Sequence, residues 1–309
     1  MSRSDDAVRV DRGELRALAN ATRGDDRARL WALTAVFAGE LVRTTGRKLL
    51  LLLPLLPALG ICAWIALRAR VETLQVPLTE QPAFALSQVR YALIAGAMWG
   101  GVAAAVVAAG QVPRDLRAGA LLLYFTRPIR RFDYVLGRWL ATAGWLAVGT
   151  ITPAVLVAVF AASQLAWPPG GREGLASWLF WPGVAAAAAT SGVLSAAALA
   201  SVALGAGALL RNAASAGIGM IGLALASTVV ANLFVLLWGR DSLVGALDLV
   251  QGLTASWTLL SRPLEAVAPP RMTTLEAALA CGVWLALAVG GWQATVRTVA
   301  AAPLGKGRA

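Results

Sequence analysis

The chain has 309 residues, of which 58% are hydrophobic and 14% charged, and its mean hydropathy is +0.69. Soluble domains carry about 25% charged residues, so the composition argues against a soluble protein. There is no His, which excludes His-containing metal sites, and the two cysteines, Cys62 and Cys281, lie in apolar stretches, which argues against a disulfide framework. The net charge of +11 is compatible with a nucleic-acid partner until its placement along the chain is considered.

The amino-terminal region divides into two parts. Residues 1–29 are dense in charge, and we expect a mobile cytoplasmic tail there. Over residues 30–48, Leu33, Phe37 and Leu41 recur at helical spacing, which predicts an amphipathic helix at the cytoplasmic interface, with Glu40 among its polar positions. The alternative is a cytoplasmic continuation of the first membrane span. A polar start of this length does not fit a cleavable signal peptide, so we expect the first span to remain as an anchor.

Six stretches lack Asp, Glu, Lys and Arg over the roughly 20 residues that a helix needs to cross a hydrocarbon core of about 30 Å. They are residues 49–67, 91–110, 139–162, 183–210, 213–238 and 275–296. Each is apolar all round, without the alternation of a barrel strand. The sequence therefore predicts an all-α polytopic membrane protein, with a six-helix transmembrane domain over 49–296 and a cytoplasmic tail over 297–309.

The basic residues are distributed unequally between the two sides of this topology. If the amino terminus is cytoplasmic, 20 Lys and Arg lie on the cytoplasmic side and 7 on the other. Positively charged loops are retained in the cytoplasm. We therefore predict that both termini are cytoplasmic and that the basic excess reflects a lipid membrane and not a nucleic-acid partner. The membrane expected for this multi-pass protein is a bacterial inner membrane.

Two further patterns concern the later spans. Those at 183–210 and 213–238 are rich in Gly and Ser, which predicts close helix packing. The longest external loop, residues 240–274, has leucines at helical spacing, and we expect one or two short helices that dip toward the membrane.

The sequence contains no arrangement typical of an enzyme. It has no phosphate loop of the G-x-x-x-x-G-K-[ST] type, no paired carboxylates and no nucleophile with a base. We expect no catalytic residue, no metal site and no ATP hydrolysis by this chain alone. The predicted spans also lack the ionisable residues with which secondary carriers and channels usually build their pathways, so the energy source is expected outside the membrane helices.

The most specific segment follows the second span and covers residues 111–141. Pro113 is suited to open a short cytoplasmic helix, Asp115 falls in its first turn, and Pro128 is suited to stop it. Leucines between them, including Leu116, Leu121 and Leu123, predict an apolar ridge that needs burial against a partner or lipid. The alternative is a positive-inside anchor formed by the arginines that follow.

This segment resembles the cytoplasmic loop of ABC type-2, exporter-class transporter permeases. The residues that carry the resemblance are Asp115, Leu116, Gly119, Leu121, the pair Arg127 and Pro128, Arg131, Tyr134, Gly137 and Arg138. The six-span layout and the preceding interfacial helix with Glu40 extend it over most of the chain. The charged tail before residue 30 is longer than in many members of that family.

The resemblance implies that this loop is a coupling helix that docks into a separate ATPase subunit, which binds the ATP and Mg. It also implies that two permease subunits, identical or different, form the pathway between them. It does not imply a substrate. Two other functions stay open from the sequence: a secondary carrier or channel, and a non-transporting ABC-like scaffold or mechanotransmitter.

Overall fold

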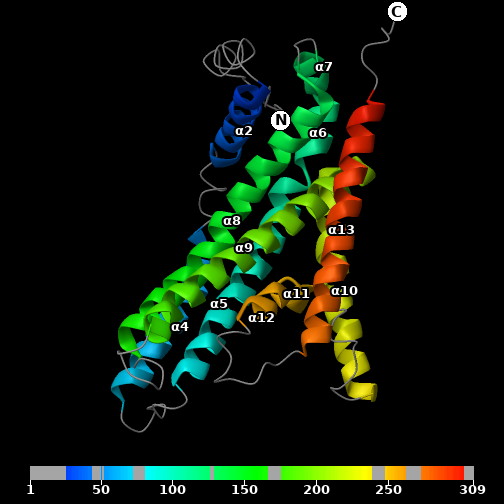
Figure 1. Cartoon of the computed structure of the whole chain (residues 1–309). Coiled ribbons are helices and arrows are strands. Elements are labelled where there is room, and N and C mark those ends of the chain that lie inside the picture. The colour runs from blue at the N-terminus through cyan, green and yellow to red at the C-terminus, as the bar shows by residue number, and fades with distance from the viewer. Residues whose placement is uncertain are drawn as a thin grey trace, which may run out of the picture.

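The computed structural model describes residues 26–43, 50, 52–71, 81–125, 129–165, 175–238, 248–261 and 273–302. Within these ranges every regular element is helical, which confirms the all-α prediction (Figure 1). The elements are α2 (Asp26–Val42), α4 (Leu55–Arg70), α5 (Gln81–Ala103), the π-helix η2 (Ala104–Ala108), α6 (Gln111–Arg117), α7 (Ala120–Phe125), α8 (Arg131–Gln164), α9 (Leu175–Leu210), α10 (Ala213–Trp238), α11 (Leu249–Gly252), α12 (Ala255–Ser261) and α13 (Thr274–Ala301).

Five of the described helical stretches are long and apolar enough to span a membrane, which supports a multi-helix integral membrane protein. They are Ala83–Arg117, Arg131–Gln164, Phe180–Leu210, Ala213–Leu233 and Thr274–Ala301. The remaining predicted span, 49–67, is the first along the chain and corresponds to α4. This helix has 16 residues and therefore a length of about 24 Å, which is shorter than the hydrocarbon core is thick. Its helix starts late because Pro54 occupies the N-cap and because an interior proline disrupts helical hydrogen bonds.

Helices occupy the other predicted spans, and most of these helices are longer than the apolar windows. The span predicted at 213–238 coincides with α10, whereas α8 and α9 start eight residues before the predicted 139 and 183, and α13 ends five residues after the predicted 296. The extra residues of α8 and α13 include charged ones, which an apolar window omits. Those of α9 are uncharged and lie before Gly183, where the predicted window begins after Pro182. The second span does not end at Gly110 but runs through η2 into α6.

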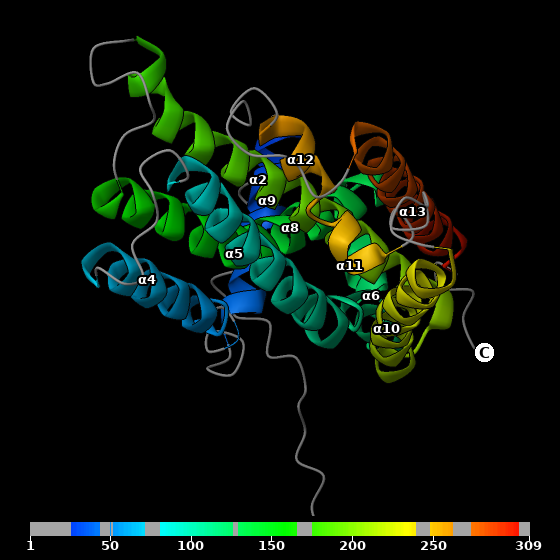
Figure 2. The same ribbon diagram turned by 90° about the horizontal axis from the view of Figure 1, so that it is seen from below.

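The helices are arranged around a central group of three. Helices α5, α8 and α9 lie together, with α4 on one side and α10 and α13 on the other (Figures 1 and 2). In an apolar window of the α5–α6 stretch 61% of the residues are buried, compared with 6% in α10 and 11% in α13. Few side chains of α10 and α13 are therefore buried within the bundle.

Glycines allow the later helices to pack closely, as the sequence predicted. A Cβ atom at Gly205 of α9 would lie within 3.0 Å of the backbone of Gly291 on α13, closer than carbon atoms pack. Likewise, Gly207 of α9 and Gly217 of α10 approach backbone carbonyls of Ala109 and Ala105. Small residues at these crossings bring the helix backbones into contact.

The loop after α10 contains the two short helices that were expected, α11 and α12. They lie within the bundle, between α9 and α13. Ser195 of α9 donates a hydrogen bond to the Leu253 carbonyl, and the Trp284 indole of α13 donates to the Leu249 carbonyl at 3.0 Å. Asp248, at the start of this segment, is only 4% exposed and accepts a hydrogen bond from Thr228 of α10. The segment thus carries an ionisable residue into the bundle, which inspection of the spans alone did not reveal.

Helix α2 corresponds to the predicted amphipathic helix over 30–48, although it begins at Asp26 and ends at Val42. Its apolar residues Leu33, Phe37 and Leu41 are at most 1% exposed because they pack into the core that α8 shares. The predicted charged tail lies outside the described residues over 1–25, as does the carboxyl-terminal tail over 303–309.

Candidate functional site

The family-like residues converge around Arg138, a side chain of α8 that is 2% exposed. The Arg138 guanidinium donates from Nη2 to Asp115 Oδ2 at 2.7 Å and Oδ1 at 2.9 Å, and from Nε to Oδ2 at 3.1 Å. Its Nη1 donates to Glu40 Oε2 at 2.7 Å. One cation therefore joins three helices: α2 through Glu40, α6 through Asp115 and α8 itself.

Aromatic rings enclose this ion cluster. The guanidinium carbon of Arg138 lies 4.0 Å from the centre of the Phe37 ring, a cation–π contact. Phe37, Tyr124 and Tyr134 form a ring triangle with centroid separations of 5.7 to 5.8 Å. The Tyr134 hydroxyl donates a hydrogen bond to Asp115 Oδ2. The rings exclude water from the pair, and Asp115 receives donors from two side chains of α8.

Burial makes the two acidic partners energetically different. The side chain of Asp115 is 12% exposed and that of Glu40 is 47% exposed. Removing one member of a buried ion pair costs about 3 to 5 kcal/mol because the remaining charge is uncompensated. An exposed pair contributes at most about 1 kcal/mol. The junction of α6 with α8 should therefore depend on Asp115 more than the junction of α2 with α8 depends on Glu40.

The segment from Pro113 to Gly119 differs from the expected free-standing coupling helix. Pro113 does not open a new helix, because α6 begins at Gln111 and continues the α5–η2 stretch. Asp115 is consequently buried at 8% exposure and does not lie in the first turn. The helix ends at Arg117, and Gly119 two residues later has a φ of +66°, in the left-handed region that glycine adopts without a Cβ penalty. There the chain turns into α7.

The expectation of an exposed leucine ridge is corrected by the structure. Leu121 is 5% exposed and packs in the core with Phe37 and Tyr134, because α7 folds back against α2 and α8. Leu116 is half-buried and packs against the cluster of Val112, Leu204 and Ala208. The side chain of Leu123 and all of Pro128 lie outside the described residues. Helical periodicity identified these leucines as apolar but did not show that the chain itself covers them.

Gly137 and Arg131 also lie at this end of the bundle. A Cβ atom at Gly137 would meet Leu33 and Phe37 of α2 at 3.4 Å, so the absent side chain brings α2 close to α8. Arg131 donates a hydrogen bond to the carbonyl of Ala300 in the last turn of α13. Arg117, at the end of α6, donates to the Arg211 carbonyl in the turn between α9 and α10 at 3.1 Å. The α6–α8 region is therefore tied to α2, to α13 and to the turn between α9 and α10.

The surface over the buried cluster is basic. Arg114, Arg117, Arg130 and Arg211 are exposed there, whereas Asp115 beside them is buried. We call these four arginines, together with the exposed Ala118, the basic end. Such a surface attracts a partner with an acidic face and accelerates its association.

Several site residues were not identified from the sequence. Phe37 was seen only as part of an apolar stripe, and Tyr124 only as part of the apolar ridge between Pro113 and Pro128. Gln111 is 4% exposed and accepts a hydrogen bond from Thr142 at 3.3 Å, below the ion cluster. The position of Phe37, three residues before Glu40 on one face of a helix, was the available clue.

The chemistry of this cluster is structural. Within the described ranges, no group of three or more His, Cys, Asp or Glu side chains is placed to hold a metal ion. All three charged groups of the cluster are used in mutual pairing, and the Tyr134 hydroxyl is used in binding Asp115. The arrangement fixes α2, α6 and α8 with respect to one another.

Comparison with known proteins does not assign this chain to a family, so its function has to be inferred from the sequence and from this geometry. No protein-family model matches the sequence, and no curated protein is similar to it.

Proposed function

We propose that this chain is the membrane-spanning permease subunit of an ATP-driven ABC transporter of the type-2 exporter class, with a separate ATPase subunit docking at the basic end. The observation that carries the proposal is the shared cation Arg138. It joins Asp115 and Glu40, two of the family-like positions, although they lie 75 residues apart in the chain.

The geometry suggests how a partner's movement would reach the membrane helices. Helix α6 continues the α5 stretch, and Asp115 binds it to α8 through a buried ion pair. A force applied at Gly119 and Ala118 would therefore move α5 and α8 together, since separating them would expose an uncompensated charge. Arg117 and Arg131 extend the same connection to the α9–α10 turn and to α13.

The energy source follows from the sequence. The chain has no phosphate loop, so we assign the binding of ATP and Mg, and the hydrolysis, to the partner. This chain would supply no catalytic residue. Its own contribution would be the pathway and the docking surface.

The remaining features of the proposal concern assembly and location. We propose a dimer of permease subunits, identical or different, in a bacterial inner membrane, with both termini and the basic end in the cytoplasm. The six-span count belongs to this proposal, with α4 as the short first span. The sparsely buried faces of α10 and α13 leave room for lipid and for a second permease.

The alternatives make different predictions. A carrier or channel would work without an ATPase. A scaffold or mechanotransmitter would bind the ATPase but move no solute. Buried Asp248 is the feature that most favours a carrier, because intramembrane carboxylates often lie on ion pathways. Its position directly before α11, bound to Thr228 of α10 and away from the Arg138 cluster, does not link it to docking.

The test is purification of the chain from its native membrane at low salt. We expect an ATP-binding subunit to copurify in about equal amount and to hydrolyse ATP. The variant Arg114→Glu should reduce its recovery at least about fivefold, about 1 kcal/mol, because it places an acid opposite an acidic face. The matched control Arg70→Glu changes an exposed arginine in the last turn of α4, far from the basic end, and should have no effect.

Normal recovery of the ATPase with Arg114→Glu would show that the basic end is not the docking surface. Absence of any ATPase from the wild-type preparation, together with solute flux in reconstituted vesicles, would favour the carrier. A copurifying ATPase without flux of any tested solute would favour the mechanotransmitter.

A further inference from the structure

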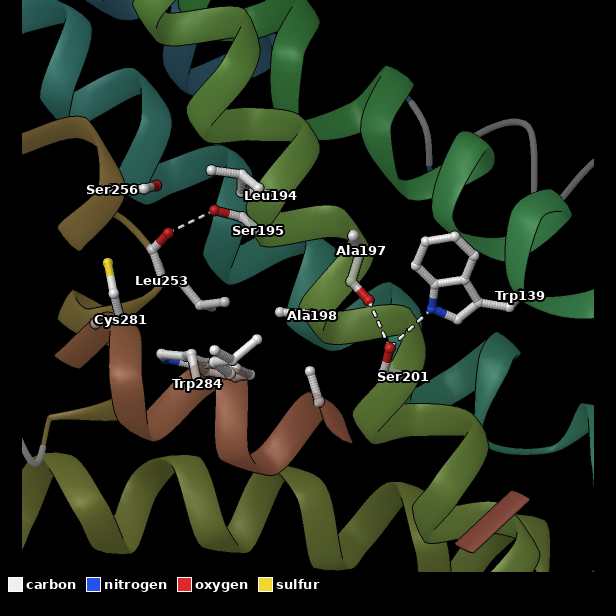
Figure 3. A pocket seen from close by; sticks show the side chains of 13 residues that line it. Trp139, Leu194, Ser195, Ala197, Ala198, Ser201, Leu253, Ser256, Cys281 and Trp284 are labelled. Atoms are coloured by element: carbon white, nitrogen blue, oxygen red, sulfur yellow. Dashed lines mark hydrogen bonds between the residues drawn. The ribbon is translucent and has the colours of Figure 1, made fainter. Parts of the chain in front are cut away.

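A cavity of about 400 Å³ lies among α8, α9, α13 and the α11–α12 segment (Figure 3). Its wall includes Trp139 of α8, Ala198 of α9, Leu253 between α11 and α12, and Trp284 of α13. Along α9 the lining extends from Leu194 to Ser201, about 10 Å. The cavity is separate from the ion cluster at Arg138, and the proposed docking function does not use it.

The polar groups in the wall are already engaged with one another. The Trp139 indole donates to the Ser201 hydroxyl at 2.8 Å, and Ser201 donates to the Ala197 carbonyl at 3.0 Å (Figure 3). Ser195 donates to the Leu253 carbonyl, and Ser256 shares a hydrogen bond of 2.8 Å with Ser191. The wall therefore presents carbon atoms, the sulfur of Cys281 and occupied hydroxyls to the space.

The short helices complete this wall from the loop side. The hydrogen bonds from Ser195 to Leu253 and from Trp284 to Leu249 hold the segment against α9 and α13. A Cβ atom at Gly252 would lie within 3.0 Å of the Trp284 indole, so the absence of a side chain at Gly252 leaves room for the indole ring. The cavity is thus built by specific contacts between elements distant in sequence.

The rim of the cavity lies near the middle of the membrane spans. Leu194 is 51% exposed and Leu285 is 66% exposed. Leu285 lies about 16 Å along α13 from Thr274, and Leu194 about 21 Å along α9 from Phe180, so both are far from the helix ends. At that depth the surroundings are hydrocarbon chains and not headgroups or water.

We propose that this cavity binds one hydrocarbon chain of a membrane phospholipid, which enters sideways between α9 and α13. A polar ligand would find its hydrogen-bonding groups unpaired against this wall. Water would find too few partners, since apolar cavities stay dry and bind apolar molecules. A flexible chain can follow the elongated lining and supply the van der Waals contacts that an empty cavity lacks. The indoles of Trp139 and Trp284 provide large apolar faces.

This inference depends on the membrane-spanning character of the helices and not on an ATPase partner. Loss of ATPase copurification would therefore leave it intact, and its failure would leave the docking proposal intact.

The experiment uses the full chain in nanodiscs of phosphatidylcholine that include a phospholipid with a photoreactive diazirine near the end of one acyl chain. After irradiation, mass spectrometry locates the adducts. We expect them on the cavity-lining residues of α9 and α13. Ala198→Trp, which fills the cavity, should reduce labelling there at least about fivefold. The matched control Ala186→Trp lies on the same helix, is exposed and does not line the cavity, and should leave labelling unchanged.

A second filling variant, Ala288→Phe, approaches from α13 and serves if Ala198→Trp fails to yield a monodisperse protein. Labelling of the cavity that neither filling variant reduces would overturn the proposal, as would adducts confined to the outer face of α10. Labelling by a photoreactive alkyl alcohol but not by the phospholipid would reject the lipid as the source of the chain.

Discussion

Asp115 and Glu40 bind the same guanidinium, that of Arg138, but from environments that differ in exposure to water. The Tyr134 hydroxyl binds Asp115, and the Phe37 ring packs against the Arg138 guanidinium. The side chain of Asp115 is 12% exposed, whereas that of Glu40 is 47% exposed. Shielding decides how much a charge pair contributes to stability, so the two acids should respond differently to neutralisation.

Asp115→Asn should destabilise the protein by about 3 kcal/mol, because the buried Arg138 loses its main counter-charge. Glu40→Gln should cost less than about 1 kcal/mol, since water screens that pair. Unfolding of the purified protein in mixed micelles by increasing fraction of denaturing detergent measures both. Equal losses for the two variants would show that Asp115 is not shielded as described.

Gly119 tests the turn between α6 and α7. Its φ is +66°, and nothing lies within 4 Å of the position of an added Cβ, so conformation alone requires the glycine. Gly119→Ala should cost about 1 kcal/mol, and Gly119→Asn less, because asparagine tolerates the left-handed region. Gly144→Ala is the control, since Gly144 has the same open surroundings within helix α8 and no positive φ. The measurement is the rate of amide hydrogen exchange in α7, which should rise in Gly119→Ala and not in Gly144→Ala. Equal exchange rates in the two variants would show that the turn does not require a glycine at position 119.

The crossing of α9 and α13 tests the helix packing. Gly205→Ala forces a Cβ against the Gly291 backbone, and we expect a loss of about 2 kcal/mol or more from overpacking. Gly290→Ala, one position from Gly291, meets nothing within 4 Å and should be neutral or slightly stabilising. Thermal unfolding followed by fluorescence distinguishes them. Similar melting temperatures would mean that the two helices do not cross at these glycines.

The sequence predicted the helices well because lipid permits few structures for an apolar stretch of 20 residues. It also placed Asp115, Tyr134 and Arg138 in the functional loop, but only because they match the pattern of a known family. The pairing of these three side chains was not predictable from the sequence. It requires α6 to continue from α5 through the π-helix at Ala104–Ala108, and no local sequence signal marks a π-helix.

Two of the expectations drawn from the sequence were wrong for the same physical reason. Leu121 was expected at a partner surface and Pro113 at a helix start, and both expectations treated the loop as isolated from the bundle. In the structure Tyr124 of α7 contacts Phe37 of α2 and Tyr134 of α8, and Leu121 is buried in the same core. Tertiary packing of this kind is not encoded in the periodicity of one segment. The entry of α11 and α12 into the bundle was equally hidden, because their short apolar pattern does not reveal what they pack against.

Membrane orientation is tested by single cysteines in a chain in which Cys62 and Cys281 are replaced by alanine. A cysteine at Thr273, exposed at the start of α13, should react with an impermeant thiol reagent in intact cells. One at Ala118, exposed beside Gly119, should react only after the membrane is opened. The pair is matched in exposure. Reaction at Ala118 in intact cells would place the basic end outside and exclude a cytoplasmic ATPase there.

The most direct test of the docking proposal is site-specific crosslinking from the basic end in native membranes. A photoreactive benzophenone amino acid is placed at Ala118, and a second protein carries it at Arg70 in the last turn of α4. After irradiation the account predicts a covalent adduct between the Ala118 position and an ATP-binding subunit, and none from the Arg70 position. An ATP-binding subunit that copurifies with the chain but forms no adduct at Ala118 would contradict it.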